Sequence, residues 1–159
     1  MKSELKTAKP ASGSRIHMTE LILPNDANVL GNVLGGRVMH WIDLAAATTA
    51  HRHCNSICVT AAIEGLSFLN PIKVGELAHL DARIVYTGRT SLIVKVEVHS
   101  EDMDTGVTKK TAEAYLVFVN LGADGKPQIV PPLLIQNDEE KAERARAELI
   151  KARYSKVKE

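Results

Sequence analysis

Apolar residues follow a helical repeat in the first third of the chain. Between Gly36 and about His53 they recur with the spacing of one helix face. The residues of this repeat are Val38, Met39, Ile42, Ala45, Ala46 and Thr49. Alanine is the strongest helix former, and its small side chain lets a second element approach closely. The pattern therefore predicts one long apolar helix, which the segment CNS at 54–56 ends.

The pattern changes to strand-like alternation after this helix. Four segments rich in β-branched residues cover 57–69, 76–88, 91–102 and 108–121. The alternation is clearest in LIVKVEVHS, where Leu92, Val94, Val96 and Val98 face one way. The stretches NPIKVGE, GRT, DMDTG and GADGKP, which lie between and after these segments, carry turn-forming residues. With a short strand over MTELILP, from Met18 to Pro24, the segments predict a five-stranded antiparallel sheet.

One apolar helix and one antiparallel sheet predict an α+β fold. Each has an apolar face to bury, so we expect the sheet to wrap around the helix. A five-stranded sheet leaves edge strands, and pairing with a second copy covers an exposed apolar edge. A homodimer is therefore the expected minimum assembly. From Asp138 on, the segment DEEKAERARAELIKARYSKVKE predicts a charged, peripheral helix, which the prolines at 131–132 separate from the sheet.

Composition narrows the function classes. The chain has 159 residues, 45% of them hydrophobic and 25% charged, as expected for one soluble domain. A net charge of +1 argues against a nucleic acid or an anionic membrane as partner. No apolar run reaches the ~18 residues of a membrane span. Residues 1–14 predict a disordered tail without the apolar core of a signal peptide. Two cysteines without a framework of spacings favour a cytoplasmic location.

Two glycines and an aspartate mark a candidate site on the predicted helix. Gly35 and Gly36 begin it, where backbone N–H groups lack partners and the helix dipole is positive. A glycine has no Cβ to hold a carbonyl group away from these N–H groups, so the pair can form an oxyanion hole. Asp43 follows about two turns later, on nearly the same face. The alternative is a plain turn at the glycines and a solvated aspartate.

These residues also carry a family resemblance. The segments LPNDANVLGNVLGGRVMHWIDLAA and VTAAIEGLSFLNPIKVGELAHLDARIVYTGRTSLIVKVEV resemble the hotdog-fold acyl-CoA thioesterases of bacteria and animal cytosol. The resemblance covers about residues 15–135, including a P-x-x-V-G turn and GRTS. Its specific motif, Asn-x-x-Gly-x-x-x-Gly-Gly followed by Asp, is intact. One departure is Leu34, where several relatives have histidine or phenylalanine.

The resemblance implies a fold, a reaction and a site. The fold is a hotdog domain at 15–135, followed by the helix at 136–159. The reaction is hydrolysis of a fatty acyl-CoA to free acid and coenzyme A, without a metal or other cofactor. Asn28 and Asp43 would be the catalytic pair, with Asp43 acting as general base or as nucleophile. The N–H groups of Gly35 and Gly36 would bind the thioester carbonyl. The acyl chain would lie between helix and sheet.

The resemblance also implies an assembly and a nucleotide contact. The assembly would be at least a homodimer, and a hexamer built as a trimer of dimers. In relatives with two hotdog domains in one chain, the asparagine of one domain works with the aspartate of the other. The turn of Arg89, Thr90 and Ser91 would contact the CoA phosphates. Plain hairpin chemistry is the alternative for this turn.

Other candidate chemistry is weaker. In the segment HRHC, His51 and His53 point to different faces of a helix and cannot easily share a metal ion. We expect these histidines to complement the helix dipole instead. We expect Cys54 and Cys58 to be inert small apolar residues and not nucleophiles. His40 lies on the wrong turn for a hotdog dehydratase. The remaining alternative function is a non-catalytic acyl-CoA binder or sensor, although binding alone requires neither Asn28 nor Asp43.

Overall fold

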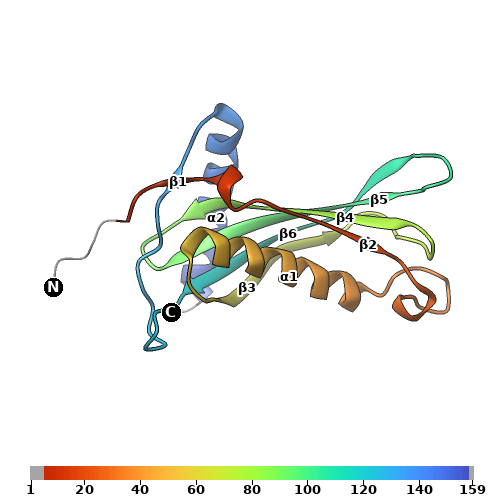
Figure 1. Ribbon diagram of the computed structural model, residues 1–159, viewed down its shortest axis with the longest axis horizontal. Coiled ribbons are helices and arrows are strands. Elements are labelled where there is room, and N and C mark those ends of the chain that lie inside the picture. The colour runs from red at the N-terminus through yellow and green to blue at the C-terminus, as the bar shows by residue number, and fades with distance from the viewer. Residues whose placement is uncertain (1–5, 158–159) are drawn as a thin grey trace.

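A five-stranded antiparallel sheet carries a long helix along one face (Figure 1). The computed structural model of the protein describes residues 6–157. The strand order in the sheet is β2-β4-β5-β6-β3, and a separate parallel pair joins β1 to β7. The elements in chain order are β1 Lys9–Pro10, β2 Ile16–Leu21, α1 Gly35–Cys54, β3 Cys58–Phe68, β4 Leu77–Thr87, β5 Ser91–Glu101, β6 Thr108–Asn120, β7 Leu133–Leu134 and α2 Asp138–Val157. The predicted α+β fold is confirmed.

The alternation along β5 places two different cores on the two faces of the sheet. Leu92, Val94, Val96 and Val98 are each 0% exposed and pack in the core that contains the buried face of α1. The alanines of α1 allow the close approach that the sequence predicts, since Ala45, Ala46 and Ala50 are also 0% exposed. Ile93 points the other way, into a second cluster on the opposite face.

The charged helix α2 covers this second face, which corrects the prediction of a peripheral helix. Ala147 and Ile150 of α2 pack there against buried side chains of β4, β5 and β6. Those side chains are Val85, Ile93, Tyr115 and Val117. Two buried positions on an otherwise charged helix gave too weak a sequence signal for this docking. Figure 1 shows α2 behind the sheet, on the side away from α1.

A network of charges fixes α2 against the sheet. Arg83 of β4 donates to both carboxylate oxygens of Glu143 on α2, and its Nη1 also lies 3.2 Å from Asp81 Oδ1. Lys95 of β5 is 3.6 Å from Glu143 and 3.3 Å from Glu97. The Arg83 side chain is only 12% exposed, so its charge depends on these carboxylates for compensation.

The segment before β2 is part of the fold, so the predicted tail over 1–14 is wrong at its end. Lys9 and Pro10 pair with Leu133 and Leu134, and Ala11 is buried. The Nζ atom of Lys9 also donates to the carbonyl oxygen of His53, at 2.8 Å, at the end of α1. These contacts join distant parts of the sequence, which composition alone does not reveal. Residues 1–5 lie outside the described part.

Strand β3 is an edge of the sheet and carries exposed apolar side chains. Val59, Ile63 and Phe68 are 42%, 37% and 53% exposed. The neighbouring loop before α1 adds Val29 and Leu30, which are 103% and 79% exposed. An apolar edge of this kind is suited to pairing with a second chain. No helix within residues 6–157 is long and apolar enough to cross a membrane.

Candidate active site

The amino end of α1 presents an open backbone. Leu34 occupies the N-cap position and makes no side-chain capping hydrogen bond. The N–H groups of Arg37 and Val38 both donate to the Leu34 carbonyl oxygen, at 3.0 and 3.2 Å. The N–H groups of Gly35 and Gly36 precede them, in the turn that has no acceptors within the helix. A Cβ atom at Gly36 would meet nothing within 4 Å, so a ligand can reach this backbone.

Asp26 holds the loop that leads into this helix. Its buried carboxylate accepts the Leu23 N–H at 2.9 Å and lies 3.1 Å from Nε of Arg37. Its carbonyl oxygen accepts the Leu34 N–H at 2.8 Å. One residue thereby fixes both the start of the loop and the first turn of α1. Sequence analysis missed Asp26, whose position in LPNDAN resembles any turn aspartate.

Asn28 lies in this loop and is exposed. Its Oδ1 accepts the N–H groups of Leu30 and Asn32, at 2.9 and 3.3 Å, so the side chain closes a turn on its own backbone. None of the hydrogen bonds found within residues 6–157 uses its Nδ2 group. The amide therefore has a fixed orientation and an available N–H donor.

Asp43 is half-buried on α1 and is paired with a threonine of β3. Oγ1 of Thr60 donates to Oδ1 of Asp43 at 2.7 Å. Thr60 lies at a register shift between β3 and β6, which extends from Thr60 to Ala62. Such bulges turn a side chain away from the regular alternation and are frequent beside active sites. Sequence analysis missed Thr60, because a bulge depends on the pairing of two distant strands.

The two parts of the predicted site are separated within one chain. Asp43 follows Gly36 by seven helical residues, which corresponds to roughly 10 Å along the axis. A general base must approach the proton it removes to ~3 Å, so a thioester oxygen bound at Gly36 is not in direct contact with Asp43 of the same chain. The connection from β2 to α1, which contains Asn28, lies beyond the amino end of α1 (Figure 1). The seven-residue spacing predicts a shared helix face for the two residues, but the rise along the axis sets them apart.

An apolar cavity of about 310 Å³ opens beside Gly35. Its apolar walls come from the loop before α1, from α1, from the end of β3 and the connection after it, and from β6. They are formed by Val33, Val38, Phe68, Leu69, Ile72 and Ala112. The Phe68 ring would lie 3.6 Å from a Cβ atom at Gly35, an ordinary van der Waals distance, so the ring packs close to the start of the helix. The cavity can hold an apolar chain next to the open backbone.

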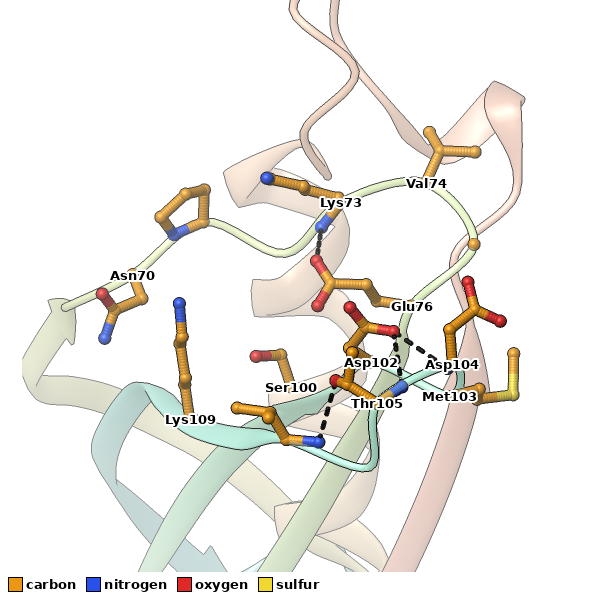
Figure 2. A pocket seen from close by; sticks show the side chains of 13 residues that line it. Asn70, Lys73, Val74, Glu76, Ser100, Asp102, Met103, Asp104, Thr105 and Lys109 are labelled. Atoms are coloured by element: carbon orange, nitrogen blue, oxygen red, sulfur yellow. Dashed lines mark hydrogen bonds between the residues drawn. The ribbon is translucent and has the colours of Figure 1, made fainter.

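A larger and more polar cavity, of about 620 Å³, adjoins the apolar one. Asn70 and Pro71 line both cavities. Figure 2 shows Lys73, Lys109 and the carboxylates of Glu76, Asp102 and Asp104 around it. The hydrogen bonds drawn there are those of the turns themselves, such as the Lys73 N–H to Glu76 at 2.8 Å. Charges of both signs line this cavity, so it has no clear preference for an anion.

The turn of Arg89, Thr90 and Ser91 lies at the other end of α1. The Thr90 carbonyl oxygen accepts the N–H of Asn120, and Asn120 is paired with Cys58 at the start of β3. Ser91 is buried and accepts Nζ of Lys151 at 2.9 Å. Arg89 is exposed, so it is the side chain of this turn that is accessible to an anion.

His53 differs from its predicted role. It is 0% exposed, and Nε2 lies 2.7 Å from the Pro131 carbonyl oxygen. Burial lowers its pKa, more than the hydrogen bond to Pro131 raises it, so the ring is neutral and does not complement the helix dipole. The Lys9 ammonium group supplies that charge instead. Within residues 6–157, no cluster of three or more His, Cys, Asp or Glu side chains could hold a metal ion.

Comparison with known proteins places this geometry in a family. The chain matches the thioesterase superfamily over residues 30–107. A hexameric acyl-CoA thioesterase, solved in its apo form, is 39% identical with a TM-score of 0.91, over 95% of this chain and 97% of that one. The chain belongs to the acyl-CoA thioester hydrolase family. This hotdog-fold family also includes the cytosolic acyl coenzyme A thioester hydrolase of Mus musculus, which is 37% identical over 139 residues. The match covers 82% of this chain but only 36% of the mouse protein, so the chain spans about a third of that relative.

A second solved member of the family contains coenzyme A. The acyl-CoA hydrolase of Staphylococcus aureus, in complex with butyryl coenzyme A and coenzyme A, is 34% identical with a TM-score of 0.86. The match covers 95% of this chain and 94% of that one. Variants of the same Staphylococcus aureus protein named Asn28Ala, Asp43Ala and Thr60Ala have also been solved.

Proposed function

We propose that the protein hydrolyses the thioester of an acyl-CoA to a carboxylic acid and coenzyme A. The observation that carries the proposal is the pair of Asp43 and Thr60, in which a carboxylate of α1 accepts a hydrogen bond from a hydroxyl of β3. Family membership supports the substrate class. The Staphylococcus aureus variants support the residues, because Asn28, Asp43 and Thr60 here have the same types and numbers as the three residues changed there. A cytoplasmic location is part of the same proposal.

Each site would combine residues of two chains. An isologous dimer can pair β3 with its copy in antiparallel orientation, and a twofold axis near Glu64 then sets Thr60 opposite Phe68 of the partner subunit. Within one chain Phe68 packs beside Gly35, and Thr60 contacts Asp43. The dimer would therefore bring Asp43 of one chain toward Gly36 and Asn28 of the partner subunit. This arrangement would remove the separation of roughly 10 Å along α1 between Gly36 and Asp43 of one chain.

The chemistry follows from these positions. The N–H of Gly36 would bind the thioester oxygen and stabilise its negative charge as the carbonyl carbon becomes tetrahedral. Asp43 would remove a proton from the attacking water or attack the carbonyl carbon itself, and Thr60 would hold the carboxylate in place. Nδ2 of Asn28 would orient the water or the thioester. The acyl chain would enter the apolar cavity beside Gly35, and the thiol of coenzyme A would leave.

The same dimer would also place the contact with the CoA phosphates, and it would be the unit of a larger assembly. The turn at Arg89 lies at the Cys58 end of β3, which the dimer brings toward the open helix end of the partner subunit. Arg89 would then contact the CoA phosphates, with Thr90 at its side, while Ser91 stays bound to Lys151. We expect the dimers to assemble further into a hexamer, a trimer of dimers, as the hexameric relative suggests.

A thiol-release assay over a series of acyl-CoA chain lengths tests the proposal. We expect turnover with at least one chain length, and a loss of at least ~10²-fold in the Asp43→Asn variant, which keeps the shape of the side chain but removes its basicity. Coenzyme A binding, measured by calorimetry, should survive the substitution. Binding of acyl-CoA without turnover in the unmodified protein would instead support a non-catalytic binder.

A further inference from the structure

Lys151 of α2 contacts the turn at Arg89, where the proposed function places the CoA phosphates. Its Nζ atom donates to Oγ of Ser91 at 2.9 Å and lies 5.5 Å from the centre of the Tyr154 ring. The side chain is half-buried, so its ammonium group is held at the turn. An ammonium group has three N–H donors, so the bond to Ser91 leaves capacity for a ligand. Ser91 begins β5, which β6 separates from the edge strand β3, so pairing along β3 leaves this ammonium group accessible.

The turn that carries Arg89 is fixed by its own backbone. The N–H of Gly88 donates to the Ser91 carbonyl oxygen at 2.8 Å, and the Arg89 carbonyl oxygen accepts the Val130 N–H at 2.9 Å. The turn is also closely packed, because a Cβ atom at Gly88 would lie only 3.2 Å from Oγ of Ser91. A fixed turn therefore presents Arg89 to solvent beside the ammonium group of Lys151.

Neither cation at this turn has a carboxylate partner. None of the ion pairs found among residues 6–157 includes Arg89 or Lys151. Glu148 is the acidic residue that precedes Lys151 on α2, and it pairs with Arg144 at 3.3 Å. Two neighbouring cations without a compensating carboxylate attract an anion to this turn.

The charges of α2 are unevenly distributed, and its basic part lies at the turn. Residues 138–143 carry four carboxylates and one lysine, whereas residues 144–157 carry one carboxylate and five lysines and arginines. The negative end of a helix dipole favours cations, but this effect is confined to the last turn, where Lys156 is the basic residue. The basic part of α2 thus has more positive charge than the dipole explains.

We propose that Lys151 and Arg89 together bind the 3′-phosphate of coenzyme A, which makes α2 part of the CoA site. This inference rests on the proposed function and adds a binding residue to it. A phosphate monoester carries a charge of about −1.5 to −2 at pH 7, because its second pKa is ~6. The two phosphates of the diphosphate bridge lack this second ionisation. Two adjacent cations therefore match the monoester better, with the guanidinium group adding parallel N–H donors.

Calorimetry with coenzyme A and with dephospho-coenzyme A, which lacks the 3′-phosphate, tests the site. We expect Lys151→Met to weaken coenzyme A binding by about 10-fold, because a charge-assisted hydrogen bond is lost. Binding of dephospho-coenzyme A should be unchanged, which also shows that the variant is folded. In thiol release, the KM for acyl-CoA should rise while kcat stays the same.

Two further variants serve as controls. Lys151→Arg keeps the charge and should retain most of the affinity for coenzyme A. Lys141→Met removes an exposed cation from the acidic part of α2, and it should bind both ligands as the unmodified protein does.

The outcomes separate this inference from the proposed function. Undiminished coenzyme A binding in Lys151→Met would overturn the role of Lys151, and equal weakening of both ligands would overturn the assignment to the 3′-phosphate. A protein that binds coenzyme A with the expected dependence on Lys151 but releases no thiol would refute hydrolysis alone. An unmodified protein that binds no coenzyme A would overturn both.

Discussion

The Thr60 hydroxyl holds the Asp43 carboxylate in place by a single hydrogen bond. We predict that Thr60→Val, which keeps the volume and removes the donor, lowers turnover by about 10-fold. A hydrogen bond to a charged group contributes ~1.5–3 kcal/mol, and 1.4 kcal/mol corresponds to a factor of ten in rate. Thr60→Ser is the matched control and should retain most of the activity. Equal rates for the valine and serine variants would show that the hydroxyl has no role.

Gly36 allows a clean test of the backbone site. A Cβ atom there meets nothing within 4 Å, and its φ lies outside the left-handed region, so Gly36→Val should fold normally. The helix propensities of glycine and valine differ by less than ~0.5 kcal/mol, so a melt should shift by about 2 °C or less. Turnover should nevertheless fall by about 10²-fold, because the side chain blocks the N–H. Full activity in the folded variant would argue against an oxyanion hole at this backbone.

At the scale of whole elements, the docking of α2 depends on charges that acid removes. Burial alone would raise the pKa of Glu97, but Arg83, Lys95 and Lys110 more than offset it, so its pKa is lowered from the ordinary value of 4.5. A carboxyl group whose pKa is lower in the folded protein than in the unfolded chain stabilises the fold at pH values above its unfolded pKa. This stability is lost as the pH falls below about 4.5. Glu113 behaves in the same way beside Lys110 and Lys95.

We therefore predict that Glu97→Gln melts at a lower temperature than the unmodified protein at pH 7. The difference between the two melting temperatures should shrink toward pH 3, where the carboxylate of the unmodified protein is also neutral. Thermal melts of both proteins at several pH values measure this convergence. A constant difference across the range would show that the charge of Glu97 contributes nothing to the docking.

The elements that the sequence predicted well are those with a strong repeat. Helix α1 and the strands β3 to β6 begin and end within a residue or two of their predicted bounds, because their apolar repeats are long. The short β2 is displaced toward the amino end, since Pro24 begins a short turn instead of ending a strand. The pairing of Lys9 and Pro10 with β7 and the bulge at Thr60 were not predictable, because both depend on contacts between distant segments.

The candidate site was only partly predictable for the same reason. Asn28, Gly36 and Asp43 follow from a motif and from the chemistry of helix ends, and these assignments remain predictions. Asp26 and Thr60 act through contacts that no spacing in the sequence shows. The gap between Gly36 and Asp43 along α1 becomes visible only when the axial rise is counted.

In the assembled protein, each proposed site requires two chains. The open helix end and the paired carboxylate lie at separate places on one chain, and each adjoins a different part of the exposed apolar strand β3. A twofold dimer would bring them together in two equivalent sites. In this dimer, Asn28 of one chain would therefore work with Asp43 of the other.

Mixing two inactive variants tests whether Asn28 and Asp43 of one site come from different chains. Asn28→Ala and Asp43→Ala chains are refolded together and assayed for thiol release, with subunit exchange confirmed by mass. In a mixed dimer with shared sites, one site carries both substitutions and the other carries neither, so each mixed dimer should recover about half of the unmodified activity. If both residues of a site came from one chain, every site would keep one defect. Exchange without any recovered activity would contradict the shared site.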